Sequence, residues 1–378
     1  MKELREILAA STRLRQAGIP AVLATVVKTR GSTYRKAGAR MLLAADGTTV
    51  GVISGGCLEN DLRERMPMLL ASQSAELVTY DSTSPHDIIW GLGLGCAGTV
   101  DVLLEGTERS NVRDFFEFAL AALDIREPFV TGTVYADERN APAGLGSRWM
   151  MDRHRERSSG IPPGLLSSRL HDVCRDLLSS PQSGGACSTL SFEGGEACIE
   201  FVSPPLPLVV FGAGPDAVPV VRFARELGWD VTIADSRAAL LHDARFNDVK
   251  RILMPDLSDL FSCLTFSGNE AALIMTHNFD LDFQVLRQLA STPIRYIGLL
   301  GSRQRTDLLL AALRAEISDP DAAELPALYS PVGLDIGAET PEEIALSAVA
   351  EIQSVFAGGT GGSLRDRSGA VHHALIHA

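Results

Sequence analysis

The spacing of apolar and polar residues predicts a helix, several strands and a second helix in the first part of the chain. Residues 2–17 carry leucine and isoleucine at helical spacing, and residues 21–29 follow as a β-rich run. Two short strand patterns then flank an Asp-Gly pair at 46–47, the strongest short-range signal for a β-hairpin. Helical spacing returns over residues 58–70. Cys57 therefore lies at or near the N-terminus of this second helix.

The middle of the chain alternates weaker patterns with loops. Helical spacing predicts helices at 112–123 and 165–178, and a strand is expected at 129–136. The stretch from 137 to 164 is polar and rich in glycine, proline and serine, which is typical of a loop. Two consecutive prolines at 204–205 stop both helix and sheet propagation, so we expect the first domain to end there.

A second domain is indicated by apolar runs of the buried parallel-strand type. The first is residues 206–211, and four more strand patterns follow at residues 231–234, 251–254, 272–276 and 295–299. We therefore expect an α/β protein with two domains. The N-terminal one, residues 1–205, is an α+β domain, and the C-terminal one, residues 206–357, is a Rossmann-like doubly wound parallel sheet. The glycine-rich residues 358–378 are expected to form a flexible tail.

Composition narrows the class of protein. Of 378 residues, 46% are apolar and 21% are charged, and the formal net charge of −13 argues against nucleic-acid binding. No apolar run reaches the roughly 20 residues that cross a bilayer, so we expect no membrane association. The six cysteines show no disulfide framework and no zinc spacing, and Cys174, Cys187 and Cys198 are interpreted as packing residues. A reducing cytoplasm fits best.

The loop Ser-Gly-Gly-Cys before the second helix is the first candidate site. Gly55 and Gly56 leave the backbone open to close approach, and Cys57 follows them directly. Unpaired N–H groups and the positive end of the helix dipole favour a thiolate or a bound oxyanion at such a position. The alternative is a tight strand-to-helix turn with a small residue at its corner.

Two further segments of the first domain suggest ligand binding. Residues 91–98 hold four glycines around Cys96, including Gly93 and Gly95, and so many glycines favour a ligand or a closely approaching backbone. Residues 30–40 form a polar loop that contains several cations, among them Arg35, Lys36 and Arg40. These cations would hold an anionic ligand, or they belong to a solvated hairpin loop.

The second domain opens with a dinucleotide-binding fingerprint. Gly212 and Gly214 stand in a Gly-x-Gly-x-x-Ala turn between a strand and a helix, and Asp235 ends the next strand about 20 residues later. Asp235 would bind a ribose 2′-hydroxyl and so favour NAD, whereas Arg237 two residues on blurs that preference. The turn is a strong signal for the fold and a weaker one for an occupied site.

Polar residues also follow other strands of the expected sheet, where ligands collect in this class of fold. His277 is the best acid/base candidate of the domain, although a helix-capping or hydrogen-bonded histidine explains it equally well. Ser302 and Arg303 follow the last expected strand and are candidate cofactor contacts.

Motifs in order along most of the chain resemble those of the XdhC/CoxI family, accessory proteins for the maturation of xanthine dehydrogenase and related molybdenum hydroxylases. The N-terminal motifs are Gly-Ser-Thr at 31–33, Ser-Gly-Gly-Cys-Leu-Glu at 54–59 and Gly-Leu-Gly-Leu-Gly-Cys at 91–96. The C-terminal motifs are Gly-Ala-Gly at 212–214, Met-Thr-His at 275–277, Tyr-Ile-Gly-Leu-Leu-Gly-Ser-Arg at 296–303 and Gly-Leu-Asp-Ile-Gly at 333–337.

The resemblance implies a chaperone that binds the molybdenum cofactor (molybdopterin), protects it while a cysteine desulfurase installs a terminal sulfur, and delivers it to apo xanthine dehydrogenase or a related hydroxylase. Cys57 and Cys96 would then be sulfur-handling thiols in contact with molybdenum, and the glycines and loop cations would hold the pterin phosphate. We also expect a homodimer. The chain lacks iron–sulfur cysteine clusters, so an accessory protein is favoured over a self-sufficient oxidoreductase.

Two other functions are left open by the residues. The fingerprint around Gly212 and Asp235 also suits an NAD(P)-dependent oxidoreductase. Alternatively, the second domain is a dimerisation and docking module whose nucleotide site is empty.

Overall fold

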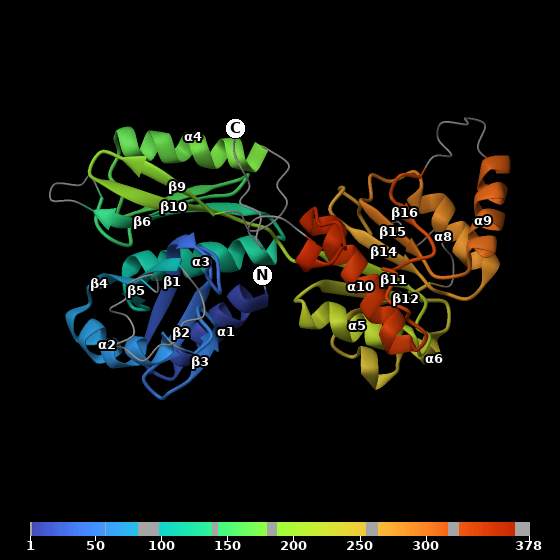
Figure 1. Ribbon diagram of the computed structural model, residues 1–378, viewed down its shortest axis with the longest axis horizontal. Coiled ribbons are helices and arrows are strands. Elements are labelled where there is room, and N and C mark those ends of the chain that lie inside the picture. Colours follow the sequence, from blue (N-terminus) through green and yellow to red (C-terminus); the bar gives the residue numbers. More distant parts are fainter. Residues whose placement is uncertain are drawn as a thin grey trace. The chain divides into compact units, whose positions relative to one another are not determined.

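The computed structural model describes residues 2–56, 58–81, 98–137, 143–179, 187–254, 264–316 and 325–366. Contacts divide the chain between Pro204 and Pro205 into two compact units, each of mixed α/β structure (Figure 1). Within the described residues, no helix is both long enough and apolar enough to span a bilayer.

The N-terminal unit contains two antiparallel five-stranded sheets. Sheet A has the order β3-β2-β1-β5-β4, and sheet B has the order β8-β7-β6-β10-β9. The strands of sheet A are β1 (Ala21–Gly31), β2 (Arg40–Ala44), β3 (Thr49–Gly51), β4 (Ala75–Asp81) and β5 (Gly98–Gly106). Those of sheet B are β6 (Phe129–Asp137), β7 (Arg148–Met151), β8 (Glu156–Ser159), β9 (Cys187–Phe192) and β10 (Gly195–Val202). The helices are α1 (Lys2–Gln16), α2 (Glu59–Ser72), α3 (Ser110–Asp124) and α4 (Leu165–Ser179).

Alternation along β1 explains how sheet A is covered on both faces. Val22, Ala24 and Val26 pack with α2 on one face, whereas Ala21 and Leu23 pack with α1 and α3 on the other. The α1 and α3 side also contacts sheet B, whose far face is covered by α4 (Figure 1). The helices predicted at 112–123 and 165–178 are confirmed as α3 and α4. The prediction of a loop throughout 137–164 is wrong, because short strands β7 and β8 lie within it and pair with each other across a tight turn.

Two buried ion pairs join sheets A and B, and the arginine comes from sheet A in one pair and from sheet B in the other. Arg40 of β2 binds Glu200 of β10, and Arg148 of β7 binds Glu105 of β5, each through both terminal guanidinium nitrogens and both carboxylate oxygens. Both arginines also lie over the ring of Phe115 in α3, at 4.8 and 5.5 Å from its centre. The two ion pairs therefore bridge sheets A and B next to one aromatic ring.

The C-terminal unit is a doubly wound parallel sheet, sheet C, with the order β13-β12-β11-β14-β15-β16. Its strands are β11 (Pro207–Phe211), β12 (Asp230–Asp235), β13 (Lys250–Leu253), β14 (Ala271–Ile274), β15 (Tyr296–Leu299) and β16 (Leu328–Tyr329). Its α-helices are α5 (Ala217–Glu226), α6 (Ala238–Leu241), α8 (Phe279–Leu289), α9 (Arg303–Glu316) and α10 (Pro341–Ala357). The predicted Rossmann-like fold is confirmed, with one strand more than the five expected. The two-residue β16 is too short to show a period in the sequence.

Both faces of sheet C are buried, as the apolar runs indicated. Leu208 and Val210 of β11 pack toward α5 and α10, and Val209 and Phe211 pack toward α8 and α9. Helix α10 begins at a capping box in which the Thr340 side chain accepts the Glu343 N–H and Glu343 accepts the Thr340 N–H.

Candidate functional site

Strand directions in sheet A bring several of the singled-out segments to one end of the sheet. Gly51, which ends β3, lies opposite Met41 near the start of β2. Gly31, which ends β1, lies opposite Gly98, the first residue of β5. The segment after β1, the segment after β3 and the start of β5 therefore share this end.

The segment around residue 57 is held by a buried serine and a buried glutamate. Ser54 donates its hydroxyl to the Glu59 carboxylate and accepts the N–H groups of Gly56 and Leu58 at 3.1 and 3.2 Å. The Ser54 N–H also donates to Glu59 at 3.2 Å. These bonds use the single donor and both acceptor positions of the hydroxyl. The backbone on either side of position 57 is thus fixed, whereas Cys57 itself lies outside the described residues.

Glu59 belongs to the family-like motif at 54–59, but the sequence pattern assigned it no role in the site. The available signal was an acidic residue in the first turn of a helix, where the dipole stabilises negative charge. The two predicted glycines differ from each other. Gly56 has a φ of +108°, which residues with a side chain rarely adopt, and a Cβ built on Gly55 meets no atom of the described residues within 4 Å.

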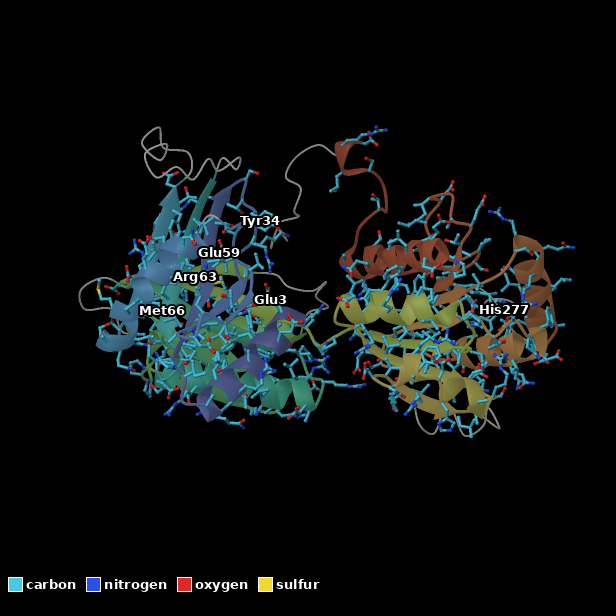
Figure 2. The ribbon with its side chains drawn as sticks, turned by 90° about the horizontal axis from the view of Figure 1, so that it is seen from below. Glu3, Tyr34, Glu59, Arg63, Met66 and His277 are labelled. Atoms are coloured by element: carbon cyan, nitrogen blue, oxygen red, sulfur yellow. The ribbon has the colours of Figure 1, made fainter. Side chains whose placement is uncertain are left out.

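Glu3 of α1 connects the two loops at this end of sheet A. One carboxylate oxygen accepts the Val52 N–H at 2.9 Å, and the other binds the Arg35 guanidinium at 2.6 Å. Figure 2 shows Glu3, Tyr34 and Glu59 in this region of the unit. Tyr34 is 60% exposed and Lys36 is exposed beside it, so this loop offers an aromatic ring and a cation to solvent.

Arg40 has a different environment from the other loop cations. It is buried, its guanidinium binds Glu200, and it donates to the Gly38 carbonyl at 3.0 Å. Burial lowers the pKa of Arg40, but the Glu200 carboxylate outweighs it, so the pKa lies above the ordinary value. The guanidinium predicted to hold an anionic ligand is therefore occupied by a carboxylate of the protein.

The second glycine-rich loop is described only where it enters β5. Cys96, Gly93 and Gly95 lie outside the described residues. A Cβ built on Gly98 would lie 2.5 Å from the Ser32 carbonyl oxygen, so the start of β5 packs tightly against the segment after β1.

In sheet C the strand order reverses between β11 and β14, which is where ligands bind in this class of fold. Gly212 follows β11 with a φ of +113°, and a Cβ there would lie 2.4 Å from the Met275 carbonyl oxygen. Only glycine fits that turn. Asp235 ends β12 with its carboxylate buried, accepting the Ala213 N–H at 2.6 Å and three N–H groups of Arg237.

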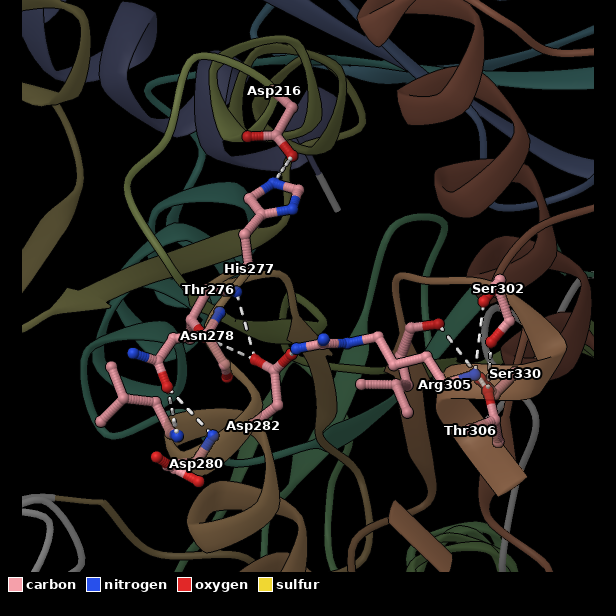
Figure 3. A network of polar contacts seen from close by, with 12 residues as sticks. Asp216, Thr276, His277, Asn278, Asp280, Asp282, Ser302, Arg305, Thr306 and Ser330 are labelled. Carbon is pink, nitrogen blue, oxygen red and sulfur yellow. Dashed lines mark hydrogen bonds and ion pairs between the residues drawn. The ribbon is translucent and has the colours of Figure 1, made fainter. Parts of the chain in front are cut away.

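His277 lies across this reversal from the glycine turn. Its Nε2 is 2.7 Å from Oδ2 of Asp216, and its side chain is mostly exposed (Figure 3). Its φ of +61° is uncommon for a residue with a side chain. The capping alternative is excluded for His277, because Asn278 caps α8 by accepting two backbone N–H groups. An acid/base role for His277 stays a prediction.

A buried network below His277 fixes the end of β14. Asp282 is fully buried and accepts the Thr276 hydroxyl at 2.6 Å and the Arg305 guanidinium at 2.7 Å (Figure 3). Ser302 precedes α9 and accepts the Arg305 N–H at 3.3 Å, and Arg303 begins that helix and is exposed. The geometry gives Ser302 a structural role at a helix start, and its cofactor contact stays a prediction.

A cavity of about 120 Å³ lies at the same edge of sheet C. The residues that line it are Asp235, Ser236, Arg237, Met254, Thr276, Asn278 and Leu281. Across the part of the chain that the structure describes, no three His, Cys, Asp or Glu side chains converge as a metal site.

Comparisons with known proteins match the N-terminal and the C-terminal unit to two family models. A model of the XdhC and CoxI family matches residues 14–81, and a model of the XdhC Rossmann domain matches residues 208–352. A relative from Bacillus subtilis (strain 168), named as a probable subunit of xanthine dehydrogenase, is 32% identical over 88% of this chain and 92% of its own length.

Two further relatives cover nearly the whole chain. The molybdenum cofactor insertion chaperone PaoD of Escherichia coli (strain K12) is 23% identical over 93% of this chain and 88% of its own. A crystal structure of a xanthine dehydrogenase from Bacillus halodurans superposes with a TM-score of 0.74 at 30% identity, covering 95% of this chain and 96% of that one. With a relative above 30% identity along most of its length and family models matching both halves, the chain belongs to the XdhC and CoxI family.

Proposed function

We propose that this protein is a molybdenum cofactor insertion chaperone that serves xanthine dehydrogenase or a related molybdenum hydroxylase. The observation that carries the proposal is the whole-length similarity to PaoD, a chaperone of that kind, together with a relative named for xanthine dehydrogenase. The shared end of sheet A supports it, because the segments after β1 and after β3, which carry two of the family motifs, lie there together with the start of β5.

The residues at that end suit the cofactor in chemical kind. The cofactor is an anionic pterin phosphate that carries molybdenum, a metal that soft thiolates ligate. Among the described residues, no atom lies within 4 Å of a Cβ built on Gly55 or Gly56, which leaves room for a ligand beside both. Tyr34 offers an exposed ring for stacking, and Lys36 offers a positive charge.

These residues would divide the work of holding the cofactor. Cys57 and Cys96 would supply thiolates, and Gly55, Gly56, Gly93 and Gly95 would supply backbone N–H groups. Arg35 and Lys36 would supply the cations, whereas Arg40 would act from within the protein by fixing the loop through Glu200. We further propose that the bound cofactor is shielded while a cysteine desulfurase sulfurates it and is then passed to the apo-hydroxylase.

The test is retention of molybdopterin during purification of the full chain. Cys57→Ala and Cys96→Ala should each retain less cofactor than the wild type, measured by fluorescence of the oxidised pterin. Cys174→Ala is the matched control, because Cys174 is fully buried in α4 and should leave retention unchanged. Undiminished retention in both loop variants would remove the thiols from the proposal.

Insertion is tested separately from binding. Loaded protein mixed with an apo xanthine dehydrogenase should restore hydroxylase activity, and restoration should be greater after treatment with a cysteine desulfurase and cysteine. If the protein retained the cofactor but transferred none of it, the protein would store the cofactor and would not act as an insertion chaperone.

An NAD(P)-dependent oxidoreductase receives less support from the geometry. The Asp235 carboxylate, which such an enzyme would present to a ribose, already accepts four hydrogen bonds from the protein. The insertion chaperone therefore remains the function that the site supports best.

A further inference from the structure

The glycine turn after β11 has the backbone of a dinucleotide site. In such sites the second glycine lets the backbone approach a pyrophosphate, which lies at the N-terminus of the following helix. Gly214 is that second glycine, and α5 begins three residues later at Ala217. A dinucleotide would therefore place its phosphates beside Gly214.

The Asp216 carboxylate lies against Gly214. A Cβ built on Gly214 would lie 2.6 Å from Oδ1 of Asp216. Asp216 is also the N-cap residue of α5, so its negative charge lies at the positive end of the helix dipole. The carboxylate therefore lies where a bound phosphate would lie, and its negative charge interacts with the helix dipole as a phosphate would.

His277 holds the carboxylate in this position. Its Nε2 contacts Oδ2 of Asp216 at 2.7 Å from the far side of the strand reversal (Figure 3). Oδ1 of Asp216 is buried and has no hydrogen-bond partner among the described residues. His277 meanwhile adopts a left-handed backbone conformation. An unpaired buried oxygen and a strained backbone both cost free energy, which indicates an arrangement kept for a purpose other than stability.

The ribose position is filled in the same manner. A carboxylate has about four acceptor positions, and Asp235 uses them for the Ala213 N–H and for the backbone N–H, Nε and Nη2 of Arg237. Asp235 is 3% exposed and its acceptor positions are already used, so two sugar hydroxyls would have to displace Arg237 from it. The cavity beside it, about 120 Å³, is also smaller than the roughly 300–1,000 Å³ that small-molecule ligands usually occupy.

We propose that Asp216 and Arg237 determine the ligand specificity of this Rossmann domain by occupying its phosphate and ribose positions, so that the turn rejects NAD(H) and NADP(H). A pyrophosphate would meet a like charge at Asp216, and a ribose diol would meet a carboxylate already bound to Arg237. This rejection belongs to the C-terminal unit alone and does not depend on cofactor binding by the N-terminal loops.

The experiment is a calorimetric titration of the full chain with NADH and, separately, with NADPH. Wild-type protein should show a Kd above about 1 mM for both. Asp216→Ala should bind both ligands at least about ten-fold more tightly, and Asp216→Asn, which keeps the shape and removes the charge, should gain less. Arg237→Ala should favour NADH in particular, because it frees Asp235 for the 2′-hydroxyl.

Asp280→Asn is the matched control, because Asp280 is an exposed aspartate at the start of α8 on the same edge of the sheet, and it should not change binding. Circular dichroism and thermal melting establish that each variant is folded. Wild-type binding at micromolar concentration would overturn the inference. A folded Asp216→Ala/Arg237→Ala double variant that binds no better than wild type would overturn it as well.

Discussion

Replacing Arg40 by methionine should lower the free energy of unfolding of the N-terminal unit by about 3–5 kcal/mol, the usual cost of leaving one partner of a buried ion pair alone. The side chains of Arg40 and Glu200 are 8% and 13% exposed, so little solvent screens the carboxylate left behind. The substitution also removes a hydrogen bond to the Gly38 carbonyl and the cation over Phe115.

Urea unfolding measures this effect in the correct unit. Trp149 lies in β7 of the N-terminal unit, so its fluorescence reports that unit once Trp90 and Trp229 are replaced by phenylalanine. A single-unit signal is needed because two domains need not unfold as one two-state system. Lys36→Met, an exposed cation of the same loop, should change stability by no more than about 0.5 kcal/mol.

A double variant separates the loss of the pair from the burial of a lone charge. Arg40→Met with Glu200→Leu should recover much of the stability, because apolar residues often replace a buried pair at little cost. The reasoning would be refuted if Arg40→Met were within about 1 kcal/mol of wild type and yet retained less molybdopterin. Arg40 would then be a ligand residue, as the sequence alone suggested.

Three further predictions concern the C-terminal unit. Gly212→Ala should lower the melting temperature sharply, because its Cβ would lie 2.4 Å from the Met275 carbonyl oxygen, and an unchanged melting temperature would contradict the geometry. Thr340→Ala should cost about 1 kcal/mol and speed hydrogen exchange of the Glu343 amide, the N–H that Thr340 accepts. Burial raises the pKa of Asp235, but hydrogen bonds from Arg237 and the Ala213 amide outweigh it and leave that pKa below the ordinary value. A lowered pKa stabilises the folded state above the unfolded value near 3.9 and stops doing so as the pH falls through the folded value. The stability advantage of wild type over Asp235→Asn should therefore shrink below about pH 4, and an advantage independent of pH would contradict this.

Local sequence patterns predicted most of the helices, strands and turns of the fold. The capping box at Thr340, the hairpin turn at 46–47 and the glycine turn at Gly212 depend on residues within a few positions of one another, so one sequence contains the whole signal. Strand β16 and the division of the N-terminal strands into two sheets depend on pairing with distant segments, which periodicity does not show.

The sequence predicted which residue types occur in the candidate site, but it did not predict which residues contact one another. The cations of the 30–40 loop were visible, but the partner of Arg40 is Glu200, 160 positions away, and nothing local identifies it. Asp235 was expected to bind a ribose, because an acidic residue at the end of the second strand has that role in dinucleotide sites. The sequence did not show that the Arg237 side chain binds the same carboxylate. Cys57 and Cys96 lie outside the described residues.

The two crossed ion pairs over Phe115 set a limit on how the N-terminal unit can be shortened. A fragment that ends after sheet A would keep Arg40 and Glu105 and discard Glu200 and Arg148, which leaves each of the two retained charges without its partner. Such a fragment would contain the whole family-matched region 14–81 and still lack both counter-charges, which lie in sheet B. A shortened N-terminal unit that keeps both ion pairs therefore has to run through β10, so the motif-bearing loops are kept together with sheet B.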